Sequence, residues 1–160
     1  MRTLVIVLVA TFAFACATVS TPPAATELPS FQFSSLRAVP VSVAVFDQRE
    51  GQERDPAWES RVDSDLRKAL QDAGVQVTSD ATTRIEIRLL RARSDFAYRN
   101  WKACVEISGR LVGPQTVEAV GDSCVTKANF FGTATADKAL RLAYQDALGK
   151  VLSALGASAH

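Results

Sequence analysis

The chain has 160 residues, 48% of them hydrophobic and 22% charged, with 18 Lys and Arg against 17 Asp and Glu. This near balance of charge excludes nucleic-acid recognition through a general basic excess, so attraction to an anionic partner has to come from local patches. With three cysteines and one histidine, the chain also offers little for metal or triad chemistry.

Residues 1–15 have the pattern of a secretory signal peptide. Arg2 precedes an apolar run from Leu4 to Ala15, and small residues end that run. As a helix the run spans only about 18 Å, which is too short for a permanent bilayer crossing. We therefore predict that residues 1–15 are removed and that the mature protein lies outside the cytoplasm.

The sequence Ala13-Phe14-Ala15-Cys16 resembles the lipobox of bacterial lipoproteins, in which the cysteine becomes the acylated first residue of the mature protein. Acylation of Cys16 would leave an even pair of cysteines, as expected for an exported chain. By the same resemblance, Ala17 implies sorting to the periplasmic face of the outer membrane. Ala13-Phe14-Ala15 also satisfies the A-x-A pattern of ordinary cleavage, so a soluble periplasmic or secreted protein remains the alternative.

Residues 16–30 are rich in Ala, Thr, Ser and Pro, and we interpret them as the lipidated cysteine followed by a flexible tether. In an extended form, such a tether would lift a domain about 40 Å from the membrane. Residues 31–160 then form a single domain of ordinary size with room for its own core.

Periodicity predicts four strands and two helices in this domain. Val41–Asp47 alternates as a strand, and Asp55 caps a helix that Gly74 ends. The remaining elements are a strand at Thr83–Ala92, a hairpin whose strands hold residues 103–111 and 117–125, and a helix at Thr135–Leu155. The order β-α-β-β-β-α predicts an α+β two-layer sandwich with two helices on one face of a four-stranded sheet.

The other face of this sheet is expected to be polar, with Arg84, Glu86, Arg88, Lys102, Glu106 and Arg110 directed to water or a partner. A hairpin turn centred on Pro114 places Cys104 opposite Cys124, because the two residues are equally far from it. Directly opposed strand residues are close enough for a disulfide. We therefore predict a Cys104–Cys124 bridge on the polar face.

Three features resemble small bacterial envelope lipoproteins of the YajG-like group: the lipobox-like start, the strand ending in Asp47-Gln48-Arg49, and the Ala/Leu-rich final helix from Ala139 to Leu148. The arrangement of helices and sheet is also similar to that of the LPS-assembly lipoprotein, which supports an outer-membrane barrel. The resemblance implies a non-enzymatic role in the envelope. The Cys104–Cys124 pair is a departure from both groups.

Candidate catalytic groups are few. His160 is terminal and unsuited to a triad, and Cys104 with Cys124 supplies only two metal ligands. The acid pairs in the sequence, Asp47 with Asp55 and Asp63 with Asp65, lack any sign of a pocket that would shift their pKa values. We expect no enzyme activity, no catalytic residue, no metal and no cofactor.

A candidate binding surface combines aromatic and basic side chains near one end of the sheet. Its members are Arg91, Arg93, Phe96, Tyr98, Arg99, Trp101, Phe130 and Phe131, with Lys102 close by. Such a surface suits an anionic amphiphile or the rim of a partner protein. The alternative is that Phe96, Trp101 and Phe130 simply close the end of the core.

The sequence thus predicts a non-catalytic, outer-membrane-anchored periplasmic lipoprotein that acts as an interaction or scaffold module in envelope biogenesis or maintenance. The alternative is a lipid- or glycan-binding periplasmic carrier. The expected partners are the membrane, through the N-terminal lipid anchor, and either an envelope protein or an anionic amphiphile. No nucleic-acid partner is expected.

Overall fold

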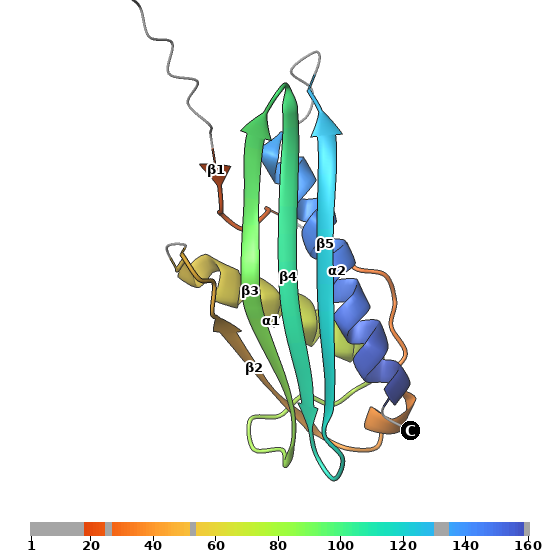
Figure 1. Ribbon diagram of the computed structural model, residues 1–160. Coiled ribbons are helices and arrows are strands. Elements are labelled where there is room, and N and C mark those ends of the chain that lie inside the picture. Colours follow the sequence, from red (N-terminus) through yellow and green to blue (C-terminus); the bar gives the residue numbers. More distant parts are fainter. Residues whose placement is uncertain (1–17, 25–26, 52–53, 130–134, 159–160) are drawn as a thin grey trace, which may run out of the picture.

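The computed structural model describes residues 18–24, 27–51, 54–129 and 135–158 (Figure 1). Cys16, Phe130 and Phe131 lie outside these residues. Five strands, two helices and a short 3-10 helix make up the fold. They are β1 (Thr18–Val19), η1 (Ser34–Leu36), β2 (Val41–Asp47), α1 (Pro56–Asp72), β3 (Thr83–Ala97), β4 (Asn100–Val112), β5 (Val117–Ala128) and α2 (Ala136–Ser158).

The α+β class is confirmed, with one more strand than expected. β2 pairs with β3 in parallel, and α1 makes the crossover between them, while β3, β4 and β5 are antiparallel neighbours. β1 pairs antiparallel with the same edge of β3, where Thr18 lies opposite Asp95 and Val19 opposite Ser94. The prediction of four strands was incomplete because residues 18 and 19 were assigned to a tether.

Both helices cover one face of the sheet, and the opposite face is open (Figure 1). The core between the layers is built from large side chains that are fully buried: Phe33, Trp58, Leu66, Leu70, Ile85, Ile87, Leu89, Ile107, Leu140, Tyr144, Leu148 and Leu152. Helix α1 has the predicted boundaries, since the Asp55 side chain accepts a hydrogen bond from the Ala57 amide and Gly74 adopts a φ of 79° after the last turn.

Strand β3 is longer than its alternating pattern indicates. A β-bulge between Leu89 and Arg91 shifts the register, so Ala92 and Ser94 face the helices and Arg93 faces outward. The break in alternation hides the continuation of the strand as far as Ala97. β3 and β4 therefore form a long hairpin that ends in a tight turn at Tyr98 and Arg99.

The register predicted for the β4–β5 hairpin is confirmed, with Cys104 opposite Cys124 and Val105 opposite Ser123. The two cysteines form a disulfide across the strands, with a Cα–Cα distance of 4.2 Å. Their neighbours Val105 and Ser123 are buried toward the helices, so the bridge lies on the open face of the sheet. It ties the two strands together without filling core volume.

Gly121 allows helix α2 to approach strand β5 closely. A Cβ atom at this position would overlap the carbonyl oxygen of Ala147 in the α2 backbone. We expect Gly121→Ala to lower the free energy of unfolding by about 1–3 kcal/mol, because the helix has to move away from the sheet. Denaturant unfolding provides the measurement. Gly113→Ala is the control, since a Cβ there meets nothing within 3.5 Å, and equal losses for both variants would contradict this packing.

Candidate functional site

The segment preceding β2 is packed along the domain. We call residues 18–24 and 27–33 the N-terminal strap. Pro23 is buried in it, Leu28 packs against the core, and Gln145 of α2 donates a hydrogen bond of 2.8 Å to the Glu27 carbonyl. The prediction of a flexible tether is therefore wrong for the described part of this segment. Composition was misleading because the strap gains order from its few apolar side chains and from donors on the helices.

A buried ion pair holds the part of the strap that directly follows β1. The Arg49 guanidinium donates two hydrogen bonds to the Asp47 carboxylate, from Nε at 2.8 Å and from Nη2 at 2.7 Å. The Arg49 and Asp47 side chains are 0% and 2% exposed. Arg49 Nη1 also donates to the Ser20 carbonyl at 3.2 Å, and the Trp58 indole N–H donates to the same oxygen. These four residues are called the strap clamp.

Asp47, a member of the strap clamp, makes three further hydrogen bonds. Its carboxylate accepts from the backbone amides of Arg49 and Asp55, each at 3.3 Å, while its own amide donates to Glu59. Burial acts to raise the pKa of Asp47, but the hydrogen bonds and the charge of Arg49 outweigh it and leave the pKa below its usual value. The Asp-x-Arg motif at the end of β2 therefore has a structural role.

Two further contacts connect the strap to the helices. Arg61 of α1 donates to the Pro23 carbonyl at 2.8 Å and also to that of Ala24. Beneath the strap, Tyr144 of α2 donates a buried hydrogen bond of 3.0 Å to Asp65 of α1. Burial raises the pKa of Tyr144 well above its usual value, and the Asp65 charge acts in the same direction. The Tyr144 hydroxyl is therefore a neutral donor at physiological pH.

The beginning of the strap lies near the β3–β4 turn (Figure 1). Thr18 pairs with Asp95, and its hydroxyl donates to the Asp95 carboxylate at 2.9 Å. Because β1 runs antiparallel to β3, Thr18 is the end of β1 nearer to the turn. Thr18 therefore lies toward the end of the molecule that carries the β3–β4 turn. We call this end, with Phe96, Tyr98, Arg99, Trp101, Lys102 and Lys127, the hairpin end.

The turn at the hairpin end consists of two residues that rarely occupy such positions. Tyr98 and Arg99 have φ angles of 50° and 61°, between the paired residues Ala97 and Asn100. Turns with two positive φ angles normally carry Asn-Gly or Asp-Gly, since a side chain in this region costs about 1–2 kcal/mol per residue. Tyr98 is also 96% exposed. A large aromatic side chain is therefore presented to the outside on a strained turn.

The candidate binding residues predicted from the sequence are only partly brought together. Arg91 forms ion pairs with Glu106 and Asp122 at 3.5 and 2.9 Å, and Arg93 pairs with Asp95 at 3.1 Å. Both arginines belong to the open sheet face and have acidic partners there. The paired charges of the two arginines therefore distinguish them from Arg99 at the turn, for which no ion pair is found within the described residues.

Phe96 and Trp101 lie opposite each other on β3 and β4, with ring centroids 4.9 Å apart. Both rings are partly buried, and Trp101 packs against the core. Trp101 thus packs at the end of the core, as the alternative interpretation held for it, while Phe96 contacts the Trp101 ring. Lys127 was missed, although the hairpin register pairs it with Trp101 and signals its place.

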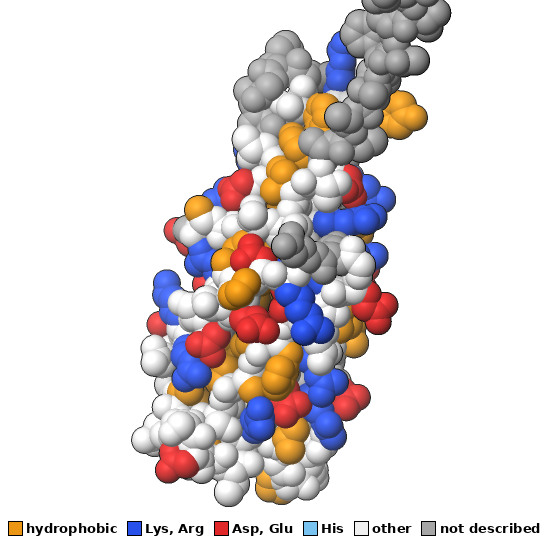
Figure 2. All heavy atoms as spheres, turned by 90° about the vertical axis from the view of Figure 1, so that its left-hand side faces the viewer, with side chains coloured by type: hydrophobic (Ala, Val, Ile, Leu, Met, Phe, Trp, Pro, Cys, Tyr) orange, Lys and Arg blue, Asp and Glu red, His pale blue; other side chains and the backbone are white. Residues whose placement is uncertain are grey.

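Basic side chains without an acidic partner gather at the hairpin end. Arg99, Lys102 and Lys127 take part in no ion pair within the described residues. On the edge of the molecule that carries β1 and β2, positive and negative side chains are interspersed (Figure 2). The mixed pattern there agrees with the balanced net charge.

The open sheet face carries its charges in pairs. Glu86 lies 3.5 Å from both Arg84 and Arg88, and Arg110 lies 3.4 Å from Glu118. Exposed ion pairs of this kind add little stability, but they leave the face with nearly balanced charge. Val120 on the same face is 65% exposed. In the described part of the chain, β5 pairs only with β4. The other edge of β5 is therefore unpaired there and lies beside the open sheet face.

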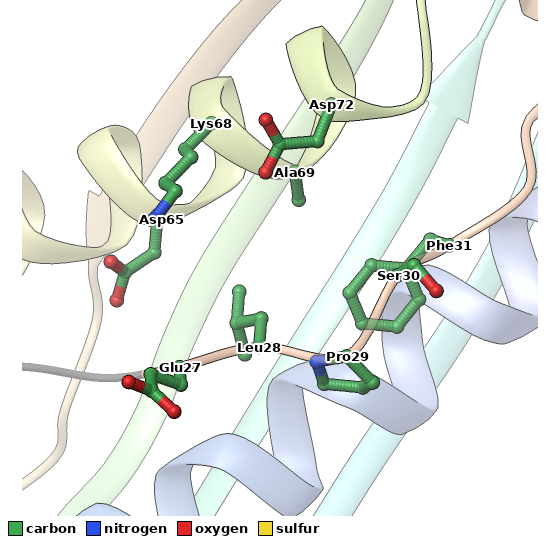
Figure 3. Close-up of a pocket in the computed structure, with 9 residues that line it drawn as sticks. All are labelled: Glu27, Leu28, Pro29, Ser30, Phe31, Asp65, Lys68, Ala69 and Asp72. Carbon is green, nitrogen blue, oxygen red and sulfur yellow. The ribbon is translucent and has the colours of Figure 1, made fainter.

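A pocket of about 390 Å³ lies between the strap and helix α1 (Figure 3). Leu28, Phe31 and Ala69 provide its apolar surface, and Lys68 lines it as well. Its carboxylates belong to Glu27, Asp65 and Asp72. Three carboxylates on so small a pocket disfavour an acyl chain or an anionic headgroup.

Within the described ranges, no group of three or more His, Cys, Asp and Glu side chains is arranged to hold a metal ion. Neither helix is long and apolar enough to span a membrane, judged over the same residues.

No protein-family model matches the sequence, and no curated protein matches it. Among solved structures, a PelC variant from Paraburkholderia phytofirmans, described as a dodecamer, has a TM-score of 0.49 and 15% identity, covering 88% of this chain and 97% of that one. Lipoprotein GNA1162 from Neisseria meningitidis has a TM-score of 0.45 and 9% identity, covering 65% and 92%. Protein XCC0632 from Xanthomonas campestris, of family DUF330, has a TM-score of 0.41 and 16% identity, covering 86% and 88%.

With TM-scores below 0.5 and identities of 16% or less, these similarities carry no argument about function. The specific resemblance to the YajG-like group is not shown by them. The functional proposal therefore rests on the geometry of this chain.

Proposed function

We propose that the protein is a non-catalytic lipoprotein of the cell envelope, anchored through Cys16 to the periplasmic face of the outer membrane, and that it acts as an interaction or scaffold module. The observation that carries the proposal is the pairing of β1 with β3, which directs the N-terminal end of the strap to the hairpin end. Two residues of chain span at most about 7 Å, so an acyl group on Cys16 brings the hairpin end to the bilayer.

This arrangement replaces a long tether by a domain held directly at the membrane. Strand β4 has 13 residues, and at about 3.4 Å per residue it extends roughly 40 Å. The β4–β5 turn at its far end then projects into the periplasm. A rigid sheet thus provides the reach that a flexible linker was expected to provide.

The open sheet face is the surface we assign to an envelope partner. It extends along the domain, its charges are paired, and Val120 is exposed on it. A face with nearly balanced charge and an exposed apolar residue suits a protein partner better than a highly charged ligand.

A non-catalytic role is supported by the state of the acidic side chains. The Asp47 carboxylate binds Arg49 in the strap clamp, and the Asp65 carboxylate accepts a hydrogen bond from the Tyr144 hydroxyl between the helices. Both carboxylates are engaged in these contacts, and Asp65, which also lines the pocket between the strap and α1, accepts the Tyr144 hydrogen bond there. Their contacts serve packing and strap docking.

The test compares the wild-type protein with Cys16→Ala in cells. We expect the wild type in the outer-membrane fraction and the variant in the soluble periplasm or uncleaved, because the acyl chains provide the anchor. A photo-crosslinking residue at Val120 is expected to capture one envelope protein, and the same residue at Glu59 on α1 serves as control. Equal fractionation of both proteins would contradict the anchor, and equal capture at both positions would contradict the partner surface.

A carrier of lipid or glycan is the second candidate, and it would use the pocket between the strap and α1. The three carboxylates there disfavour an acyl chain but can accept hydrogen bonds from the hydroxyls of a glycan. Native mass spectrometry of the protein extracted under mild conditions separates the two functions. A scaffold is expected to give the mass of the covalently modified chain alone. A bound glycan or amphiphile that is lost in Ala69→Trp, which fills the pocket, would establish the carrier instead.

A further inference from the structure

We propose that the hairpin end is itself a membrane contact, with Tyr98 placed in the headgroup region and Arg99, Lys102 and Lys127 against anionic phospholipid. The proposal deepens the proposed function and depends on it for the direction in which the domain stands. It adds a second attachment that is independent of acylation and that fixes the orientation of the domain.

The first argument is the strain at the turn. Both central residues have positive φ angles, yet neither is the Gly, Asn or Asp that such a turn favours. Strained backbone that persists in a fold is typical of functional positions. Here the strain places on the outermost turn a tyrosine whose side chain makes almost no contact with the domain, being 96% exposed.

The side chains of the hairpin end have the chemistry of a membrane interface. Tyr and Trp are enriched at membrane interfaces because their rings are apolar and one end is polar. Tyr98 provides one such ring at the turn, and the partly buried Trp101, the second residue of β4, provides another. Arg99 and Lys127 form no ion pair within the described residues, and Lys102 lies opposite Asp95, which pairs with Arg93 instead, so these three charges can turn to lipid phosphates.

The beginning of β1 lies toward the same end of the domain as the β3–β4 turn. Thr18 lies opposite Asp95, three residues before Tyr98, so the first described residue, two positions after Cys16 in the sequence, lies toward the same end of the domain as the exposed tyrosine. An acyl anchor at Cys16 would hold the turn close to the bilayer for as long as the strap stays docked. A protein partner at this surface would have to share the space with the membrane, so the geometry favours lipid.

The experiment uses the full mature chain with Cys16→Ser, which cannot be acylated, and vesicles of phosphatidylethanolamine with or without phosphatidylglycerol. Tyr98→Cys carries an environment-sensitive fluorophore, and Gln115→Cys at the opposite turn carries the same probe as control. We expect a blue shift only at position 98 and only with phosphatidylglycerol. Neutralising Arg99→Gln or Lys127→Gln should weaken vesicle binding about fivefold each, whereas Arg84→Gln at the far end of β3 leaves it unchanged.

A paired substitution separates membrane contact from folding. Tyr98→Asn combined with Arg99→Gly installs the residues that the turn favours, so the melting temperature should rise while vesicle binding falls at least tenfold. Binding that persists in this variant, or a probe at position 98 that responds to an envelope extract but not to vesicles, would overturn the proposal. Acylation of Cys16 is measured separately by mass, so failure of the anchor and failure of the hairpin contact are distinguishable.

Discussion

Replacing Asp47 by alanine, with Arg49 left in place, is expected to lower the free energy of unfolding by about 3–5 kcal/mol, because it leaves a buried guanidinium without its counter-charge. The Arg49 side chain is 0% exposed and donates both to Asp47 and to the Ser20 carbonyl of the strap. Denaturant unfolding at neutral pH measures the loss. Limited proteolysis measures its second consequence, which is release of residues 18–24 from the domain.

Asp63→Ala is the matched control for this prediction. Asp63 also pairs with an arginine, Arg67, at 2.7 Å, but the two side chains are 37% and 43% exposed. Exposed pairs contribute about 0–1 kcal/mol. A loss in Asp47→Ala no larger than in Asp63→Ala would show that the strap clamp does not hold the N-terminal segment.

Acid should remove the same contribution in the wild-type protein. The pKa of Asp47 lies below its usual value of 3.8 in the folded chain, so the unfolded chain takes up the proton first as the pH falls. The stabilisation is therefore fully present above about pH 4 and is lost as the pH falls through the folded-state pKa. The difference between wild type and Asp47→Ala should accordingly stay the same from pH 7 to about pH 4 and shrink as the pH is lowered further. A difference that stays constant in the lower range as well would contradict the assignment.

Removal of the Cys104–Cys124 bridge has the second large expected effect. The cysteines are 20 residues apart in sequence, and opening a loop of this size is expected to cost about 3 kcal/mol of stability. The double variant Cys104→Ser/Cys124→Ser should retain the fold, since the β4–β5 register is also fixed by the buried faces of the strands. Its denaturation midpoint should match that of the reduced wild type and should not respond to reductant. An unchanged midpoint on reduction would contradict a stabilising bridge.

Much of the fold was predictable because its signals are local. Helix α1 begins at a capping Asp55 and ends at Gly74, and the β4–β5 register follows from alternation around Pro114. Asp55 and Gly74 fix the backbone at the two ends of α1. The alternation of buried and exposed residues fixes which face of each strand is buried, so both patterns can be recognised in the sequence.

The strap was mispredicted because its order comes from distant residues. Ser20 is held by Arg49 and Trp58, and Glu27 is held by Gln145. Nothing in the composition of a Pro/Ala/Thr-rich segment announces these donors. A two-residue strand such as β1 likewise has no periodicity of its own and forms only because β3 continues past its bulge.

The candidate site was predictable in residue type but not in grouping. Tyr98 and Arg99 were identified by their chemistry. The expectation that Arg91 and Arg93 would join them missed their acidic neighbours, which lie on β4 and β5 for Arg91 and on β3 itself for Arg93. The positive φ angles at the turn had no signal, because Tyr and Arg are unusual there. Strain of this kind becomes visible only in the structure.

The central claim is that the chain is anchored at Cys16, beside the hairpin end of a docked domain. Intact mass spectrometry of protein extracted from the outer membrane, with thiols blocked before and after reduction, tests it most directly. The account predicts a chain that begins at an acylated Cys16 and gains thiol labels, at Cys104 and Cys124, only after reduction. A mature chain without acyl mass at Cys16, recovered from the soluble periplasm, would contradict it.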